Sequence, residues 1–428
     1  MKILHINTYD RGGAANACLR LHEGLLNFGI NSKVLVLHKT NNNFPEVYTY
    51  KQFNRKTFFL FFNKNIQRIM RKCGLHKIQI FKKEREILQE LRPEGMEMIS
   101  FITNANDITD NELFREADII HLHWIADFLD YKAFFSKCKK PIVWTFHDQN
   151  PFLGVEHFAE LFLGPDDNGE AIIRQCTAYE AKIEKKYKQI KSYIFKDLSI
   201  NIIVLSNWMK NEVLSSQMFP LAKINFIPNG IDSNHFGILD KMFCRKLLNL
   251  PLNKKIILFV SDNINNNRKG LNYLLRTIEK IKSNDFVLCT VGGSKSNLKN
   301  ENFIELGKIH DQRLMNVAYS ASDLFAIPSL MDNLPNTAIE ALLSGIPIIS
   351  FPVGGMLDMI IHKKNGYIAK KISVDALTNS INDFFWHGVE LSADEIRKDA
   401  IKRYDISVQI KNMLWLYKDI HIIVKEGK

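Results

Sequence analysis

The chain has 428 residues, of which 46% are hydrophobic and 24% charged, values that are ordinary for a globular protein of two or three domains. This composition excludes collagen-like, wholly disordered and disulfide-stapled proteins, and no run approaches the ~18 uninterrupted apolar residues of a membrane span. The net charge is +11, and residues 51–92 carry twelve Lys/Arg against three Glu, so the positive excess is concentrated in one early segment.

Short apolar runs alternate with helical stretches, which predicts parallel sheets covered by helices. The strands of a first series are predicted at 2–7, 32–37, 119–123, 142–146 and 201–205. Those of a second series are predicted at 255–260, 286–291, 324–327 and 346–350. An amphipathic helix is predicted at 14–28, ended by Gly29. Two such series indicate two doubly wound α/β domains, with the hinge just after the turn residues of 227–232.

The N-terminal residues lack the apolar core of a secretory signal, and the six cysteines are scattered without a CxxC pair. We therefore expect a protein of the reducing cytoplasm that has neither a disulfide framework nor a zinc site.

Two glycines, Gly12 and Gly13, lie between the first predicted strand and the first helix. Glycine lets a backbone approach a ligand closely, and the N-terminus of a helix offers unpaired N–H groups to an anion. A tight strand–helix turn explains the same pair equally well. The full G-x-G-x-x-G fingerprint is missing, which disfavours a dehydrogenase.

Arg268 and Lys269 follow a predicted strand and precede a predicted helix. Two adjacent cations at such a place could hold a diphosphate, Arg through a bidentate fork and Lys as a point charge. Such a pair, taken alone, is more often solvated surface.

The most informative stretch runs from Pro328 to Pro347. A strand leads into a polar loop that contains Asp332, and a helix is predicted from about Asn336, ended by Gly345. Glu340 lies about one turn inside that helix, so both carboxylates could face one crevice at the carboxyl ends of the strands. The loop amides and the helix N-terminus would supply an anion site there. Pattern alone leaves open that Asp332 is an ordinary loop residue and Glu340 an exposed one.

In their order along the chain, these motifs resemble those of the retaining glycosyltransferases of family 4, which have the GT-B architecture, over nearly the whole length. The matching positions are Gly12-Gly13, Phe146-His147-Asp148, Ser206, the I-P-N-G-I-D segment at 227–232, Arg268-Lys269, and Asp332 with Glu340 at the two acidic positions of an E-x7-E signature. The resemblance implies two Rossmann-like domains facing across a cleft. We expect an acceptor-side domain at 1–234, rejoined by a C-terminal helix at 405–428, and a nucleotide-sugar-binding domain at 235–404.

The resemblance also implies a role for each matching residue. Glu340 would bind the ribose hydroxyls of a nucleotide-sugar donor, and Arg268 with Lys269 its diphosphate. Asp332 and the loop amides from Asn333 to Asn336, a stretch that includes Leu334 and Pro335, would hold the transferred sugar. His147 would contact that sugar from the other domain, and Gly12-Gly13 would close over the phosphate.

The resemblance further implies transfer with retention by front-side attack, without a metal or another cofactor, because the Arg/Lys pair would stabilise the charge of the leaving group. Two departures from the family pattern bear on substrate. The first acidic position is Asp rather than Glu, and Gln-Asn-Pro-Phe-Leu-Gly follows Asp148 where close relatives often carry a cysteine-rich insertion.

His121 and His123 share one face of a predicted strand at i, i+2 spacing. A metal site needs further ligands, and the sequence identifies none, so a polar cleft wall or packed core is the favoured interpretation.

A basic amphipathic helix is predicted from Phe58 to Cys73, with apolar residues on one face and Lys64, Arg68, Arg71 and Lys72 on the other. Such a helix can lie on an anionic membrane surface, and it can also pack on its own domain with the basic face solvated. Nucleic acid is disfavoured as a partner because no binding motif accompanies the charge.

The leading hypothesis is thus a glycosyltransferase of bacterial surface-polysaccharide assembly, acting on a glycan or a lipid-linked glycan, cytoplasmic or peripheral on the inner membrane face. A nucleotide-sugar epimerase or a phosphorylase of the same fold, and a non-catalytic nucleotide-sugar-binding protein, are the alternatives.

Overall fold

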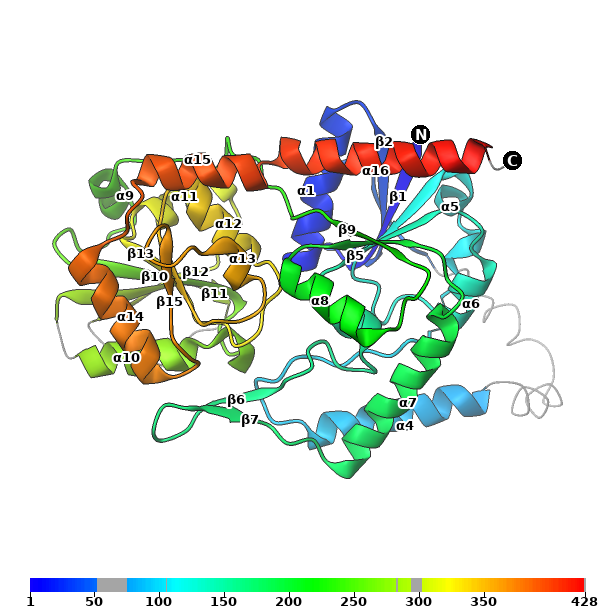
Figure 1. The fold of residues 1–428 in the computed structure, drawn as a ribbon, viewed down its shortest axis with the longest axis horizontal. Helices are drawn as coiled ribbons and strands as arrows, with labels where there is room; N and C mark the ends of the chain where they lie inside the picture. The colour runs from blue at the N-terminus through cyan, green and yellow to red at the C-terminus, as the bar shows by residue number, and fades with distance from the viewer. Residues whose placement is uncertain (52–74, 105, 282–283, 294–301, 427–428) are drawn as a thin grey trace.

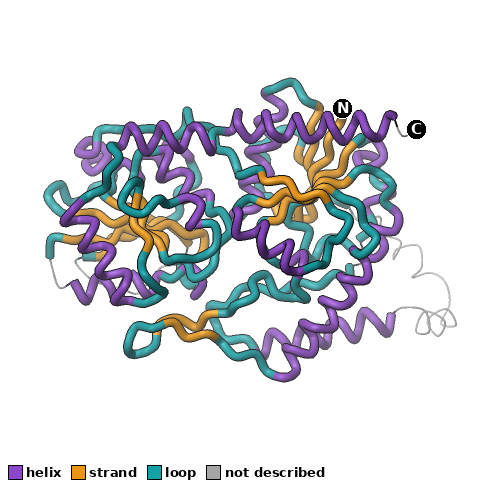
Figure 2. Tube along the Cα trace, in the orientation of Figure 1, coloured by secondary structure: helices purple, strands orange, loops and turns teal. Residues whose placement is uncertain are grey.

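The computed structural model describes all residues except 52–74, 105, 282–283, 294–301 and 427–428. It shows two α/β lobes side by side, each with strands at its centre and helices around them (Figures 1 and 2). The predicted helix from Phe58 to Cys73 lies outside the described residues.

The first lobe is built on a seven-stranded sheet with the order β3-β2-β1-β4-β5-β8-β9. All its strand pairs are parallel. The strands are β1 Lys2–Tyr9, β2 Asn31–His38, β3 Val47–Thr49, β4 Ile119–Leu122, β5 Ile142–Phe146, β8 Asn201–Val204 and β9 Lys223–Phe226. Every residue of β4 and β5 is buried, as expected for central strands that helices cover on both faces.

The second lobe is built on a six-stranded parallel sheet with the order β12-β11-β10-β13-β14-β15. Its strands are β10 Lys255–Asn263, β11 Phe286–Gly293, β12 Phe303–Gly307, β13 Leu324–Ile327, β14 Ile348–Ser350 and β15 Gly366–Ile368. The strand order reverses between β1 and β4 in one sheet and between β10 and β13 in the other. Ligands of doubly wound sheets bind at such switch points, beyond the carboxyl ends of the strands.

The helices of the first lobe are α1 Gly13–Asn27, α4 Leu75–Leu91, α5 Glu112–Glu116, α6 Tyr131–Lys137, α7 Ala178–Phe195 and α8 Asn207–Ser216. Those that follow are α9 Lys241–Leu247, α10 Leu271–Ile281, α11 Gln312–Ser320, α12 Asn336–Leu343, α13 Met356–Met359, α14 Val374–His387, α15 Ala393–Tyr404 and α16 Ile406–Glu426. Short 3-10 turns are η1 Ile108–Asp110, η2 Asn150–Phe152 and η3 Asn267–Lys269.

The last two helices run along the top of the molecule across both lobes (Figure 1). At their junction Ile231 donates its N–H to Tyr404 O (2.9 Å) and accepts from Ile406 N (3.0 Å). Helix α16 then packs on α1, where a side chain at Gly24 would meet Ile410. The segment 227–232 is therefore fixed against the α15–α16 corner, whereas the domain limits expected from the sequence stay predictions.

An antiparallel hairpin, β6 Phe162–Pro165 and β7 Ala171–Ile173, reaches from the first lobe to the second. Its turn contacts the start of α14, because Gly169 O accepts from Val374 N (2.9 Å) and Glu170 pairs with Lys371 (2.6 Å). No sequence pattern predicted this bridge between the lobes.

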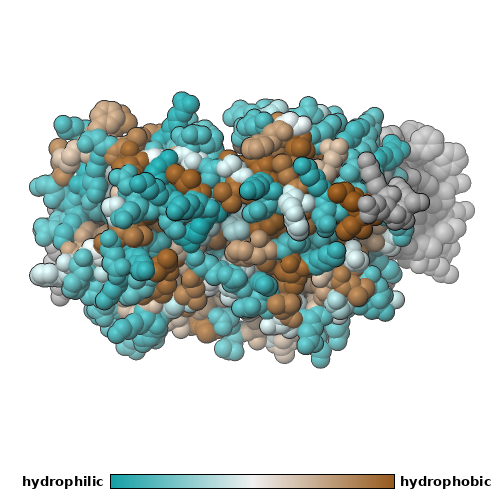
Figure 3. Space-filling view, turned by 45° about the horizontal axis from the view of Figure 1, so that its top comes forward, coloured by the Kyte–Doolittle hydropathy of each residue, from teal (hydrophilic) through white to brown (hydrophobic). Residues whose placement is uncertain are grey.

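Exposed apolar side chains lie on α16, and Trp415 is 70% and Ile422 53% exposed. Figure 3, with the top of Figure 1 turned toward the viewer, shows hydrophobic patches among hydrophilic side chains on this face. Phe28, Lys411, Trp415 and Lys418 line a shallow groove there. Within the described ranges no helix is both long and apolar enough to cross a bilayer.

Candidate functional site

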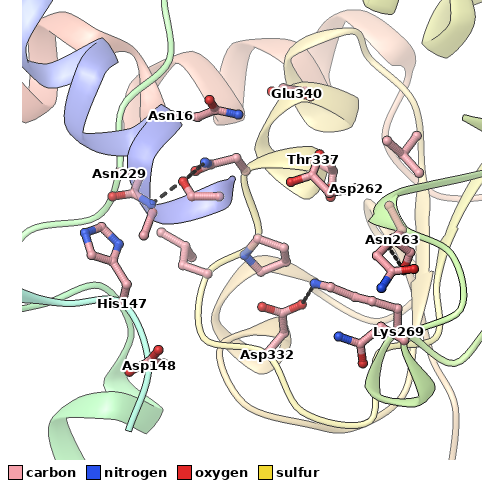
Figure 4. Close-up of a pocket in the computed structure, with 18 of the residues that line it drawn as sticks. Asn16, His147, Asp148, Asn229, Asp262, Asn263, Lys269, Asp332, Thr337 and Glu340 are labelled. Carbon is pink, nitrogen blue, oxygen red and sulfur yellow. Dashed lines mark hydrogen bonds and ion pairs between the residues drawn. The ribbon is translucent and has the colours of Figure 1, made fainter. Parts of the chain in front are cut away.

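A cleft with a volume of about 430 Å³ lies between the lobes, at the carboxyl ends of both sheets. Figure 4 shows His147 and Asp148 on one wall, with Lys269, Asp332 and Glu340 facing them. The predicted site residues that line it are Gly13, His147, Arg268, Lys269, Asp332, Leu334, Pro335, Asn336 and Glu340. Gly12 and Asn333 are not among the lining residues.

The turn η3 holds Arg268 and Lys269, the two cations expected to bind the diphosphate, which we call the clamp. Asn266 caps it by accepting from Arg268 N (3.0 Å), and Gly270 ends it in the left-handed region at φ +74°. A Cβ at Gly270 would lie 1.9 Å from Pro328 O. Only glycine fits this position, and the close approach fixes η3 beside the loop that follows β13.

Asp332 lies opposite these cations and pairs with both. Lys269 Nζ is 2.6 Å and Arg268 Nη1 3.4 Å from Asp332 Oδ2. Burial favours the neutral acid, but the nearby Lys269 and Arg268 outweigh it and hold the pKa of Asp332 below its ordinary value. Asp332 is therefore an ionised partner of the cations rather than an isolated loop residue.

Glu97, which was not predicted from the sequence, is a second carboxylate partner of Arg268. Arg268 Nε donates to Glu97 Oε1 at 2.5 Å, and Asn266 Nδ2 donates to the same oxygen at 2.8 Å. The guanidinium also lies over the ring of Phe158, 4.4 Å from its centroid. Burial works against ionisation of Glu97, yet the Arg268 charge keeps its pKa lowered. No motif marks Glu97, which is 171 residues from Arg268 in the chain.

Glu340 lies in α12, where it is only 7% exposed. Arg20 of α1 donates to Glu340 Oε1 at 2.7 Å, and Tyr319 Oη donates to Oε2 at 3.0 Å. This excludes the alternative that Glu340 is an exposed helix residue. Arg20, which carried no sequence signal, joins the two lobes across the cleft and keeps the carboxylate in a fixed orientation.

The loop before α12 connects the lobes as well as lining the cleft. The Asn333 side chain accepts from Ser206 Oγ (2.7 Å) and donates to Phe146 O (3.0 Å). Asn336 Nδ2 donates to Gly13 O at 3.0 Å. The expected run of loop amides is interrupted, since Pro335 has no N–H to donate.

Gly12 and Gly13 form the start of α1. Gly12 is the N-cap at φ +91°, a backbone conformation that favours glycine, and no side chain caps the helix there. The first N–H groups of α1 thus have no side-chain cap, at an edge of the cleft that Gly13 lines.

His147 follows β5 directly and is half-buried. Burial lowers its pKa to about 4, despite the neighbouring Asp148 charge. Asp148 accepts from Trp124 Nε1 (2.8 Å) and is 2.6 Å from His157 Nδ1. The imidazole of His147 is therefore neutral near pH 7. Burial works against ionisation of Asp148, but its hydrogen bonds and the nearby His157 keep its pKa below the ordinary value.

Behind His147, three further imidazoles are buried together. His5 joins His121 and His123, and ring nitrogens of the three lie within 4.8 Å of one another. The sequence identifies no third ligand beside His121 and His123, whereas the structure places His5 next to them as a third candidate. Both nitrogens of His121, however, contact hydroxyls, Tyr417 Oη at 2.6 Å and Thr145 Oγ1 at 2.8 Å.

Comparison with known proteins gives the family. A profile described as "Glycosyltransferase Family 4" matches residues 11–235, and one described as "Glycosyl transferases group 1" matches residues 254–385. An uncharacterized glycosyltransferase of Methanocaldococcus jannaschii is 26% identical over 51% of this chain and 60% of its own length. The O-antigen biosynthesis glycosyltransferase WclY of Escherichia coli is 27% identical over 42% of this chain and 58% of its own. The chain thus spans less than two thirds of the length of either relative.

Among solved structures, Anabaena Alr3699/HepE in complex with UDP-glucose is similar, with a TM-score of 0.64, 16% identity and coverage of 98% of this chain and all of that one. That likeness confirms the predicted GT-B fold, two doubly wound lobes facing across a cleft. With more than half of the residues matched by one family profile, the chain belongs to glycosyltransferase family 4.

Proposed function

We propose that this protein is a retaining glycosyltransferase that moves a sugar from a nucleotide-sugar to a glycan or lipid-linked glycan acceptor in bacterial surface-polysaccharide assembly. The observation that carries the proposal is that Arg268, Lys269 and Glu340 line one interlobe cleft at the switch points of both sheets. Family membership, a relative named for O-antigen biosynthesis and a structural neighbour in complex with UDP-glucose support it.

In the proposed donor complex, the diphosphate lies against Arg268 and Lys269. Both cations are already paired with Glu97 and Asp332. The diphosphate must therefore share or displace these carboxylates, and the uncapped start of α1 adds N–H groups at the opposite edge. As the sugar–phosphate bond breaks, negative charge grows on the leaving diphosphate, and the two cations stabilise it without a metal ion.

Glu340 would accept hydrogen bonds from the ribose hydroxyls. Arg20 holds it in place and Tyr319 occupies its other oxygen, so only its remaining lone pairs face the ligand. The transferred sugar would then lie between Asp332 and His147, where the acceptor hydroxyl can approach the same face of the anomeric carbon. The leaving phosphate oxygen takes the acceptor proton, and the configuration is retained.

The proposal is tested first with ligands and then with products. A thermal-shift panel of UDP-, GDP-, ADP- and CDP-sugars should find one donor that raises Tm. The product formed from that donor should then show, by NMR, the same anomeric configuration of the transferred sugar as the donor has. Inversion would contradict the retaining mechanism. A product formed only with inorganic phosphate would indicate a phosphorylase, and an isomerised donor an epimerase. No stabilisation by any of the four classes would contradict a donor site in this cleft.

A further inference from the structure

Three imidazoles form a hydrogen-bonded row from the core to the cleft. His5 lies on β1, His123 directly follows β4, and His147 directly follows β5, and these are neighbouring strands. His5 Nδ1 is 3.0 Å from His123 Nε2, and His123 Nδ1 is 3.2 Å from His147 Nε2. Both nitrogens of His123 are therefore used within the row, and His147 alone of the three lines the cleft.

Each ring of the row carries one proton near neutral pH. His5 and His123 are buried, and desolvation holds the pKa of each well below its ordinary value, with the neighbouring imidazoles acting in the same direction. A neutral imidazole has one N–H and one lone pair. Two hydrogen bonds among three such rings can form in two ways only, with all donors pointing toward the cleft or all away from it.

The two directions differ at the buried end of the row. His5 Nε2 is fully buried and has no hydrogen-bond partner among the described residues. If the row pointed inward, this atom would be an N–H donor without an acceptor. If it points toward the cleft, the atom is a lone pair without a donor. Orphaned buried N–H groups are the rarer of the two in proteins, so the outward direction is favoured.

We propose that His5 and His123 are positioning residues that lock His147 as its Nδ1–H tautomer. In this arrangement His5 donates to His123 and His123 donates to His147 Nε2, which leaves the N–H of His147 Nδ1 as the donor for a ligand in the cleft. His147 then serves as a hydrogen-bond donor to an oxygen of the bound substrate and not as a general base. That ligand role rests on the proposed function, whereas the tautomer itself does not.

The central experiment reads the tautomer directly in the protein without substrate. In a ¹⁵N-histidine-labelled sample, long-range ¹H–¹⁵N correlation spectra distinguish a protonated Nδ1 from a protonated Nε2, and the His147→Asn spectrum identifies the His147 signals. We expect Nδ1–H for His147 and for His123. Nε2–H at His147 would overturn the proposal, whatever the enzyme does with a donor.

A pair of variants separates positioning from general packing. His123→Leu removes the donor to His147, so the His147 signals should change to a mixture of tautomers. The value of kcat should fall about tenfold or more, which is the effect of removing the hydrogen-bond partner that orients a metal-binding histidine in other enzymes. His123→Asn, whose amide nitrogen lies near the position of Nδ1, should restore the parent tautomer in large part.

The matched control is His121→Leu. His121 lies on β4, two positions before His123, and is buried as well, but its hydrogen bonds go to Tyr417 and Thr145. The His121→Leu variant should lower Tm by about as much as His123→Leu does and should leave the His147 tautomer unchanged. If both leucine variants alter the His147 signals alike, packing rather than the row fixes the tautomer, and the proposal is wrong.

Elemental analysis of the purified protein tests for a bound metal ion, which would use the histidine lone pairs that the row needs for its hydrogen bonds. One equivalent of zinc in the purified protein that is lost in His5→Leu would overturn the proposal in favour of a metal site at His5, His121 and His123. If the expected tautomer is found while every nucleotide-sugar fails as a donor, the proposed function fails and the row stands.

Discussion

Arg268 and Lys269 are each paired with a carboxylate where a diphosphate is expected to bind. Glu97 and Asp332 bring two negative charges to the two positive charges of Arg268 and Lys269. Glu97 comes from the first lobe, so its contact with Arg268 also joins the two halves. At the scale of single residues, donor affinity therefore depends on how much more strongly the two cations attract the diphosphate than they attract these carboxylates.

Glu97→Gln tests this competition. The amide keeps the shape and can still contact Asn266, but it removes the negative charge beside Arg268. We expect the donor to bind about fivefold more tightly, on the order of 1 kcal/mol, the size of a partly solvated ion pair. Isothermal titration calorimetry with the donor measures this affinity. The control is Glu156→Gln, which removes the charge of a carboxylate that is paired with Arg92. Weaker binding by Glu97→Gln would mean that Glu97 supports the clamp instead of competing with the ligand.

Glu340→Ala tests the ribose contact. Loss of a charged hydrogen-bond acceptor should weaken binding of the donor and of the free nucleotide by about 1.5–3 kcal/mol. Arg20 loses its partner in this variant, so Glu340→Gln, which retains an oxygen for Arg20, separates the loss of charge from the loss of the contact between lobes. Unchanged nucleotide affinity in both variants would show that Glu340 has another role.

At the scale of elements, η3 and the loop after β13 form one unit because Gly270 brings them into contact. Gly270→Ala meets both the strain of a left-handed backbone, about 1–2 kcal/mol, and Pro328 O at 1.9 Å. It should lower Tm and abolish donor binding. Gly388→Ala is the matched control, since Gly388 has φ +69° with nothing within 4 Å of its Cβ position. Equal effects on donor binding would contradict the importance of the contact between η3 and the loop after β13 for the donor site.

The sequence predicted the central strands of both sheets because buried parallel strands are continuous apolar runs. Short edge strands such as β3 and β15 were missed, as was the β6–β7 hairpin, because three or four residues give too little pattern. Motif residues such as Lys269 and Glu340 were placed in the cleft as the resemblance implied.

Their partners could not be predicted from pattern. Glu97, Arg20 and His5 belong to no motif, and each acts on a residue far away in the chain, across 171, 320 and 118 positions respectively. Such contacts are set by how the lobes and strands pack together, and one sequence read alone holds no signal for them.

At the scale of the whole molecule, the buried imidazoles predict how stability depends on pH. Burial lowers the pKa of His121 to about 3 and that of His147 to about 4, from 6.5 in the unfolded chain. Between these values the unfolded state binds more protons, so stability falls as pH falls from about 6.5 toward 4. Calorimetric Tm values measured from pH 7.5 to 5 should decrease steadily below 6.5. A flat Tm across this range would contradict buried neutral imidazoles.

Binding of the basic helix predicted from Phe58 to Cys73 to an anionic membrane surface stays a prediction. Replacing Lys64, Arg68, Arg71 and Lys72 by Gln should release the protein from anionic vesicles, at about 1 kcal/mol per charge. Added salt should have the same effect, because exposed charges are screened beyond ~8 Å at physiological ionic strength. Lys411→Gln with Lys418→Gln, in the groove on α16, is the control for a second basic surface. A parent protein indifferent to anionic lipid would end the hypothesis.

The central claim is that the cleft binds a nucleotide-sugar diphosphate on Arg268 and Lys269, and donor turnover by Lys269→Ala tests it most directly. The comparison variant is Lys280→Ala, which removes an exposed lysine of the same lobe that pairs with Asp375. We predict that Lys269→Ala keeps a cooperative unfolding transition and loses donor turnover by at least about a hundredfold, the scale on which a charge-stabilising group acts, while Lys280→Ala turns over the donor like the parent. A folded Lys269→Ala protein with near-parent turnover would contradict the account.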